Sequence, residues 1–207
     1  MWAATGSAVA IGASALALVF FNEASTPPPR SAAGAAVDGA TRASSPAAGF
    51  RRAREDCSTR SEANFPGAFT SPRNLVVGPL VLIGGAYTDP RTVREFGGNK
   101  FPLLVKAGHS VTVRLARSAR TSAGLAYGTD GPLTTTKLRD TYDSVTFVAC
   151  RPGTGPPSGS YADGASVTFW SGFVLTRAPA CVQLDIYLDG APSPRRVGLP
   201  LGRRCAQ

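Results

Sequence analysis

The sequence predicts an all-β fold: an antiparallel β-sandwich of the immunoglobulin-like kind with about seven to eight strands, preceded by an apolar helix and a disordered spacer. Three observations support this fold class. Glycine and proline are frequent, with 23 and 17 residues, and they favour turns over long helices. From Cys57 onward, short apolar stretches alternate with Gly, Pro, Asp and Ser. No window combines a 3.6-residue apolar stripe with helix caps.

The candidate strands follow one another at regular spacing in the predicted domain, residues 57–207. The clearest period-2 alternation is at Val111, Val113 and Leu115. Residues 74–85 are apolar, with Gly78-Pro79 as an interruption or bulge. The other candidates are residues 101–106 before a tight turn at Ala107-Gly108, residues 123–128, residues 143–150, residues 165–176 with a break at Gly172, and a closing hairpin at residues 181–205.

The first 56 residues are predicted to lie outside this domain. Residues 2–21 carry no charge, and at about 1.5 Å per residue they span one bilayer, so residues 1–23 are predicted to be a transmembrane anchor or a signal segment. A poor cleavage site at Ala24 favours the uncleaved anchor. Residues 24–56 are predicted to be a disordered Ala/Pro/Ser-rich spacer, because they contain almost no large apolar side chain. Its basic run "RRAR", residues 51–54, is either a solvated linker charge or a contact to anionic lipid or wall polymer.

Four cysteines indicate where the domain resides. Cys57, Cys150, Cys181 and Cys205 form no C-x-x-C motif, so neither a zinc knuckle nor a thioredoxin-like redox pair is supported. An even count behind an export-like segment favours disulfides in an oxidising compartment. Basic residues C-terminal to the apolar segment favour a cytoplasmic domain, but they are distant from it. We therefore expect a cell-membrane protein with an extracytoplasmic domain, or a secreted protein.

The hairpin at residues 181–205 predicts the pairing of these cysteines. Matching the apolar faces of its two strands sets Leu188 opposite Val197 and Leu184 opposite Leu201. In this register Cys181 lies opposite Arg204, one residue short of Cys205, and a one-residue bulge at Gly202 would bring the two cysteines opposite each other. The prediction is a Cys181–Cys205 disulfide, which leaves Cys57–Cys150.

The net charge of +9 comes mainly from arginine, and an Arg-, Ala- and Gly-rich composition is also what a GC-rich genome produces. Seven arginines nevertheless form a candidate anion-binding face: Arg114, Arg117, Arg120, Arg195, Arg196, Arg203 and Arg204. No stacking aromatics are interleaved with them, so nucleic acid is not expected. An anionic wall polymer, a lipid headgroup or an acidic protein fits better.

No catalytic motif, metal-ligand set or cofactor fingerprint appears in the sequence. The only histidine, His109, is expected to be a surface turn residue. A copper site of the cupredoxin kind needs two histidines, a free cysteine and usually a methionine, and the only methionine is Met1. We therefore predict neither an enzyme nor a cofactor, although paired carboxylates for glycoside hydrolysis remain open.

The C-terminal segments "FWSGFVLTRAPACVQLDIYLDG" and "RRVGLPLGRRC" resemble the ends of uncharacterised secreted or membrane-anchored β-rich proteins from GC-rich, actinobacterial-type genomes. The shared features are an aromatic-Gly-Phe strand, a cysteine opening the next strand and a cysteine closing the last one. The resemblance implies an envelope location and no particular chemistry. The expected function is a membrane-tethered extracytoplasmic binding or accessory domain that contacts anionic envelope components. A cell-envelope hydrolase with an unrecognised active site is the alternative.

Overall fold

The computed structural model describes residues 49–128, 135–153 and 160–206. The predicted anchor at residues 1–23 and the spacer up to residue 48 lie outside these ranges, so the expectations for them stay predictions. In the described ranges, no helix has both the length and the hydropathy that a bilayer crossing requires.

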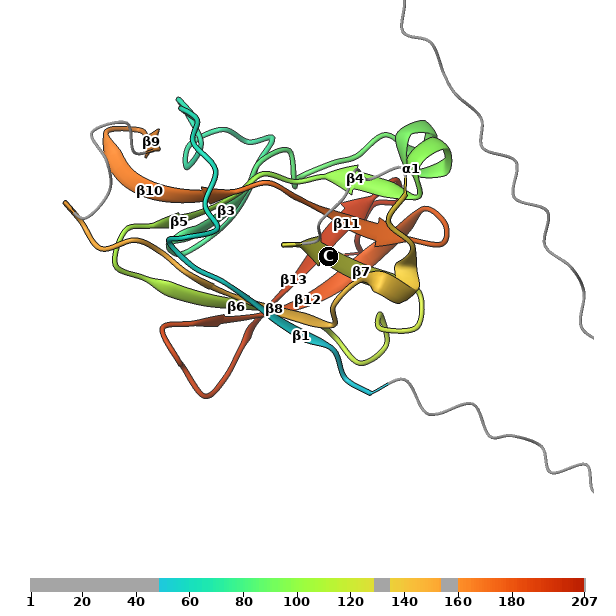
Figure 1. The fold of residues 1–207 in the computed structure, drawn as a ribbon. Coiled ribbons are helices and arrows are strands. Elements are labelled where there is room, and N and C mark those ends of the chain that lie inside the picture. Colours follow the sequence, from blue (N-terminus) through green and yellow to red (C-terminus); the bar gives the residue numbers. More distant parts are fainter. Residues whose placement is uncertain (1–48, 129–134, 154–159, 207) are drawn as a thin grey trace, which may run out of the picture. The chain divides into compact units, whose positions relative to one another are not determined.

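The described residues are mostly β and form antiparallel sheets, as predicted (Figure 1). One five-stranded sheet has the order β1 (Arg52–Glu55), β8 (Ser144–Val148), β6 (Ser110–Leu115), β12 (Ala180–Leu188) and β13 (Arg195–Leu201). A second has the order β2 (Leu75–Val77), β3 (Leu80–Leu82), β5 (Leu103–Lys106), β10 (Ala165–Trp170) and β9 (Tyr161–Ala162). A three-stranded sheet consists of β4 (Gly98–Lys100), β11 (Gly172–Thr176) and β7 (Ala123–Tyr127).

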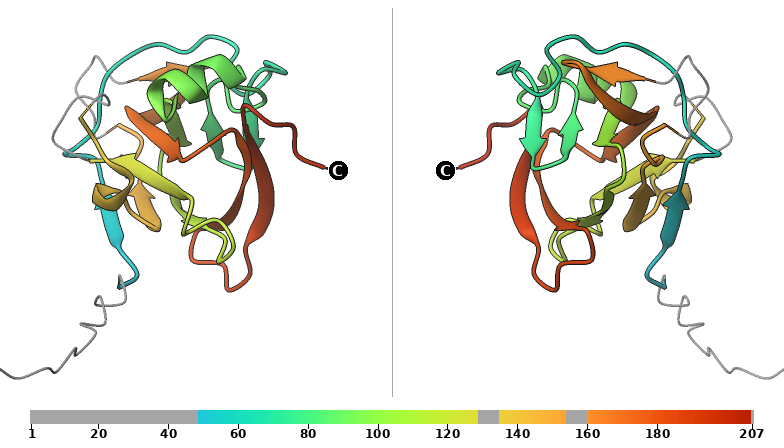
Figure 2. Two further views of the ribbon diagram at one scale, coloured as in Figure 1. Left: turned by 90° about the vertical axis from the view of Figure 1, so that its right-hand side faces the viewer. Right: turned by 90° about the vertical axis from the view of Figure 1, so that its left-hand side faces the viewer.

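Side chains from all three sheets meet in one apolar core, which the strands surround (Figure 2). Val113, Leu103 and Leu125, one from each sheet, are at most 2% exposed. An aromatic group occupies part of this core, with the ring centroid of Phe147 5.1 Å from that of Tyr127 and 5.2 Å from that of Trp170. The alternation read from the sequence therefore identifies the buried face of these strands.

Three junctions show how the predicted strands are connected, and the predicted break at Gly172 is confirmed. Gly78-Pro79 is the two-residue turn of a hairpin in which Val77 pairs with Leu80, and Gly78 has a φ of 59°. The strands on either side of Ala107-Gly108 do not pair with each other, since β5 and β6 belong to different sheets. Likewise β10 and β11 separate into two sheets at Gly172. The junctions at Ala107-Gly108 and before Gly172 carry the chain from one sheet to another, so the strands do not form a simple series of hairpins.

The folded part begins earlier than the predicted boundary at Cys57. Strand β1 lies in the expected spacer and runs parallel to β8, with Ala53 beside Val145 (Figure 1). The carboxylate of Asp143 accepts a hydrogen bond of 2.8 Å from the backbone N–H of Arg51. A four-residue edge strand with two exposed arginines has no apolar alternation, so its pairing partner, and not its composition, orders it.

A short helix, α1 (Pro90–Phe96), was not predicted. Asp89 caps its N-terminus by accepting the Arg91 N–H at 2.7 Å, and Gly97 ends it with a φ of 67°. Only Val93 is buried, so a helix of this length shows no apolar stripe. The sequence does contain capping residues for this helix: Asp89 precedes it, Pro90 is its first residue and Gly97 follows it. A single 3-10 turn, η1 (Leu138–Asp140), precedes β8.

Candidate functional site

Both predicted disulfides are present. The Cα atoms of Cys181 and Cys205 are 5.0 Å apart, and those of Cys57 and Cys150 are 4.9 Å apart. The sulfurs of all four cysteines are thereby used, so none is available as a nucleophile or metal ligand. Among the described residues, no group of three or more His, Cys, Asp or Glu side chains could hold a metal ion.

The predicted register of the closing hairpin is wrong. Leu184 pairs with Val197, where the prediction placed Leu201. The connection between β12 and β13 covers residues 189–194 and begins with Asp189 and Gly190, which have positive φ, 49° and 75°. Relative to the prediction, the ladder is shifted by four residues.

Cys205 reaches Cys181 by a turn at the strand end and not by the predicted bulge. Cys181 pairs with Pro200, and the chain then reverses at Gly202, whose φ is 72°. The disulfide lies over Gly198, where a Cβ atom would overlap the sulfur of Cys205. The glycine leaves the space that the sulfurs fill.

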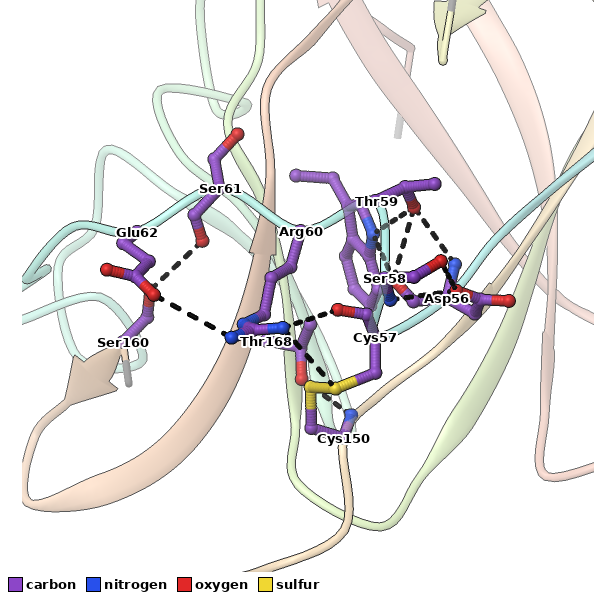
Figure 3. Close-up of a disulfide and its surroundings, with 11 residues drawn as sticks. Asp56, Cys57, Ser58, Thr59, Arg60, Ser61, Glu62, Cys150, Ser160 and Thr168 are labelled. Carbon is purple, nitrogen blue, oxygen red and sulfur yellow. Dashed lines mark hydrogen bonds and ion pairs between the residues drawn. A yellow bond between two sulfur atoms is a disulfide. The ribbon is translucent and has the colours of Figure 1, made fainter. Parts of the chain in front are cut away.

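The second disulfide joins the residues after β1 to the end of β8 (Figure 3). Arg60 spans from this bond to Glu62, donating to the Cys57 carbonyl at 2.7 Å and approaching the Glu62 carboxylate at 3.7 Å. The Thr168 hydroxyl accepts the Cys150 N–H at 2.7 Å. These contacts fix the course of the chain between β1 and the second five-stranded sheet.

The seven predicted anion-binding arginines do not share one face. Arg114 and Arg196 lie on the outer side of the first five-stranded sheet, 3.3 Å and 3.2 Å from the carboxylate of Asp185. The guanidinium of Arg114 also lies over the ring of Tyr187, 4.6 Å from its centroid. Because Asp185 faces both cations, their charge is partly neutralised within the protein.

The other five predicted arginines are dispersed. Arg117, Arg195 and Arg203 are exposed. Arg204 lines a separate hollow beside Cys205. Arg120 alone enters a larger pocket, and there it meets three arginines that the prediction did not include in the face.

This arginine pocket has a volume of about 540 Å³. Its charged residues are Arg51, Arg120, Arg139, Arg177 and Asp143, and the rest of its wall is Gly49, Phe50, Thr121, Ala123, Leu138 and Thr141. The four arginines come from four separate segments: the residue before β1, the turn between β6 and β7, η1, and the end of β11. With four guanidinium groups and one carboxylate, the lining carries a net charge of +3.

Two of these guanidinium groups are held by the protein. Arg120 donates through Nε to the Leu115 carbonyl at 3.2 Å, and its guanidinium lies 4.5 Å from the centroid of the Phe50 ring. Arg51 donates to the carbonyl of Arg139 and lies over the ring of Tyr142. Aromatic stacking and carbonyl contacts restrain the rotamers while leaving other N–H donors of each fork for a ligand.

His109 is a turn residue, as predicted. Its Nδ1 lies 2.9 Å from the carboxylate of Asp189, and both side chains are about half exposed, at 43% and 51%. The N–H of Ser110 donates to Asp189 and, together with His109, holds the pKa of that carboxyl below its usual value. Neither residue lines any of the hollows described here, and no hydrogen bond in the described part of the chain joins a hydroxyl to the His109 ring.

Sequence reasoning found one arginine of the pocket and missed three. Arg51 is the first residue of the basic run, which was weighed as a contact to anionic polymer but assigned to the spacer. Arg139 and Arg177 are isolated in the sequence, so no local pattern marks them. Comparisons of the chain with protein families, with curated proteins and with solved structures gave no match.

Proposed function

We propose that this chain is an extracytoplasmic binding or accessory domain, tethered at the cell membrane by its N-terminal segment, whose arginine pocket holds phosphate groups of an anionic envelope component. The observation that carries the proposal is the set of four arginines around one pocket with a single carboxylate. Arginine forks match the oxygens of phosphate and carboxylate groups, and phosphate spreads its charge over enough oxygens to engage several forks.

The ion pairs of the basic side chains favour this pocket, rather than the arginines of the outer sheet, as the anion-binding site. Asp185 already faces Arg114 and Arg196 across the outer sheet. In the pocket, Asp143 instead accepts the backbone N–H of Arg51, and no ion pair in the described part of the chain joins it to a guanidinium. Arg139 lies 3.9 Å from the carboxylate of Asp140, whereas no ion pair in the described residues reaches Arg51, Arg120 or Arg177. The charge of these three arginines is therefore left for a ligand.

The scaffold and location form part of the same proposal. Two disulfides suit an oxidising compartment outside the cytoplasm. A β-sandwich arrangement accounts for one apolar core shared by the two five-stranded sheets, while the immunoglobulin-like strand order stays a prediction. A cell-envelope hydrolase also stays a prediction, and no described geometry nominates its catalytic residues.

The test is binding of glycerol 3-phosphate by calorimetry, together with cosedimentation on vesicles of phosphatidylcholine with and without phosphatidylglycerol. The variant Arg120→Gln/Arg177→Gln should weaken glycerol phosphate binding by about tenfold or more, since charge-assisted hydrogen bonds are lost. The charge-matched control is Arg91→Gln/Arg94→Gln on α1, which should leave binding unchanged. Binding to anionic vesicles without binding to the soluble phosphate identifies a lipid surface as the source of the phosphate.

Two results contradict the proposal. Equal losses in both double variants would mean that net charge, and not the pocket, attracts phosphate. Absence of binding to the soluble phosphate and to the anionic vesicles alike would remove the ligand class.

A further inference from the structure

A second pocket, of about 570 Å³, lies along β1. We call it the Glu55 pocket; its lining is Arg52, Ala53, Arg54, Glu55, Thr59, Ser61, Gly128, Tyr142, Trp170 and Ser171. Glu55 is the last residue of β1 and is only 5% exposed. The pocket therefore contains the carboxylate of a residue that is otherwise nearly buried.

In the described part of the chain, no hydrogen bond and no ion pair reaches the carboxylate of Glu55. Buried carboxylates in proteins are normally paired or hydrogen-bonded, because water no longer solvates the charge. By contrast, the buried Asp185 has two arginine partners. Glu55 thus has acceptor capacity that the protein itself does not use.

The arginines beside Glu55 in the sequence do not neutralise it. In a strand, successive side chains point to opposite faces, so Glu55 shares its face with Ala53, and Arg52 and Arg54 point to the other. The guanidinium of Arg52 lies 5.0 Å from the centroid of the Phe50 ring. The charge of Glu55 is therefore not compensated from its own strand.

Gly128 shows that the carboxylate occupies a fitted position. A Cβ atom at Gly128 would overlap Glu55 Oε1, so the absence of a side chain makes the room in which the carboxylate lies. The pocket lining also includes the hydroxyl-bearing residues Thr59, Ser61 and Ser171 and the aromatic residues Tyr142 and Trp170. The Tyr142 ring is already covered by the guanidinium of Arg51, and Trp170 is 2% exposed.

We propose that the Glu55 pocket binds an organic ammonium group, the primary amine of a small or polymer-borne ligand. An ammonium has three N–H donors, which Glu55 and the serine hydroxyls can accept. A divalent metal is a poorer match, because hard cations take six or more oxygen ligands and Glu55 is the one carboxylate in the lining. The Glu55 pocket shares no lining residue with the arginine pocket, so this proposal does not depend on phosphate binding.

Trp170 supplies the readout, because the chain has two tryptophans and the other is Trp2. In the full chain with Trp2→Phe, n-butylammonium chloride should change the fluorescence of Trp170 in a saturable way. Neutral n-butanol and anionic butyrate at equal concentration and ionic strength should not. Adding Glu55→Gln should weaken the butylammonium response by about tenfold or more. Glu62→Gln, at an exposed carboxylate that faces Arg60, is the matched control and should leave the response unchanged.

The proposal is overturned if butanol and butylammonium act alike, if no saturable response occurs, or if Glu55→Gln, folded by circular dichroism, responds as the parent does. Should Glu55→Gln fail to fold, the comparison of the three butyl compounds on the Trp2→Phe protein decides alone. Loss of phosphate binding in the arginine variants leaves this result untouched, so failure of either proposal can be recognised separately.

Discussion

Removing each disulfide in turn tests how the two crosslinks divide the stability of the domain. The Cys57–Cys150 bond joins residues 93 apart in the sequence, and Cys181–Cys205 joins residues 24 apart. In the chain-entropy account, closing the longer loop stabilises the fold by about 4.7 kcal/mol and closing the shorter one by about 3.5 kcal/mol. We expect Cys57→Ala/Cys150→Ala to lower the free energy of unfolding more than Cys181→Ala/Cys205→Ala.

Urea denaturation at 25 °C, followed by circular dichroism, measures this difference. With a slope of about 2 kcal/mol per molar urea, the midpoints should fall by about 2.4 M for the long loop and about 1.8 M for the short one. Both variants lose the same atoms, so each controls for the other. An unchanged slope would show that the comparison concerns stability and not the compactness of the unfolded chain.

Equal shifts, or a larger shift for the short loop, would refute the reasoning. The second result has a specific alternative cause in this structure, because the Cys181–Cys205 sulfurs also pack over Gly198. Packing, rather than loop closure, would then dominate the contribution of that bond.

Two further predictions concern the closing hairpin. Gly198→Ala places a Cβ atom where the sulfur of Cys205 lies, so we expect the Cys181–Cys205 bond to form incompletely. Mass spectrometry of non-reduced peptides should then detect free thiols at these two cysteines. Full oxidation with an unchanged free energy of unfolding would contradict the packing of the disulfide over Gly198. The pKa of Asp189 lies below the 3.8 that is usual for an aspartate, chiefly through the Ser110 N–H and then His109. The contribution of the ionised carboxyl to stability is therefore present above pH 3.8 and is lost as the pH falls through the lower pKa of the folded state. The difference in unfolding free energy between the wild type and Asp189→Asn should therefore shrink between pH 5 and pH 2.5, and a constant difference would exclude the ionised carboxyl as its cause.

The sequence was sufficient to predict which residues of a strand are buried, because this depends on the local alternation of apolar and polar side chains. Val182, Leu184 and Ile186 are buried along one strand, and Leu199 and Leu201 along its partner, as the period-2 pattern indicates. The cysteine pairing followed because these two strands are adjacent, whatever their register. Register depends also on the length of the connection, residues 189–194, and matching the apolar faces of the two strands does not determine that length.

Geometry separates the members of the predicted arginine face. Arg114, Arg117 and Arg120 are three apart, a spacing that gathers side chains on one face of a helix but not of a strand. Strand β6 ends at Leu115, so Arg114 stays on the sheet beside Asp185 while Arg120 follows the turn into the pocket. The partners of Arg120 come from pairing between distant segments, as when the parallel contact of β1 with β8 brings Arg51 against Asp143, 92 residues away. Only the fold could reveal the full set, because Arg139 and Arg177 are isolated in the sequence and no local pattern joins them to Arg51 or Arg120.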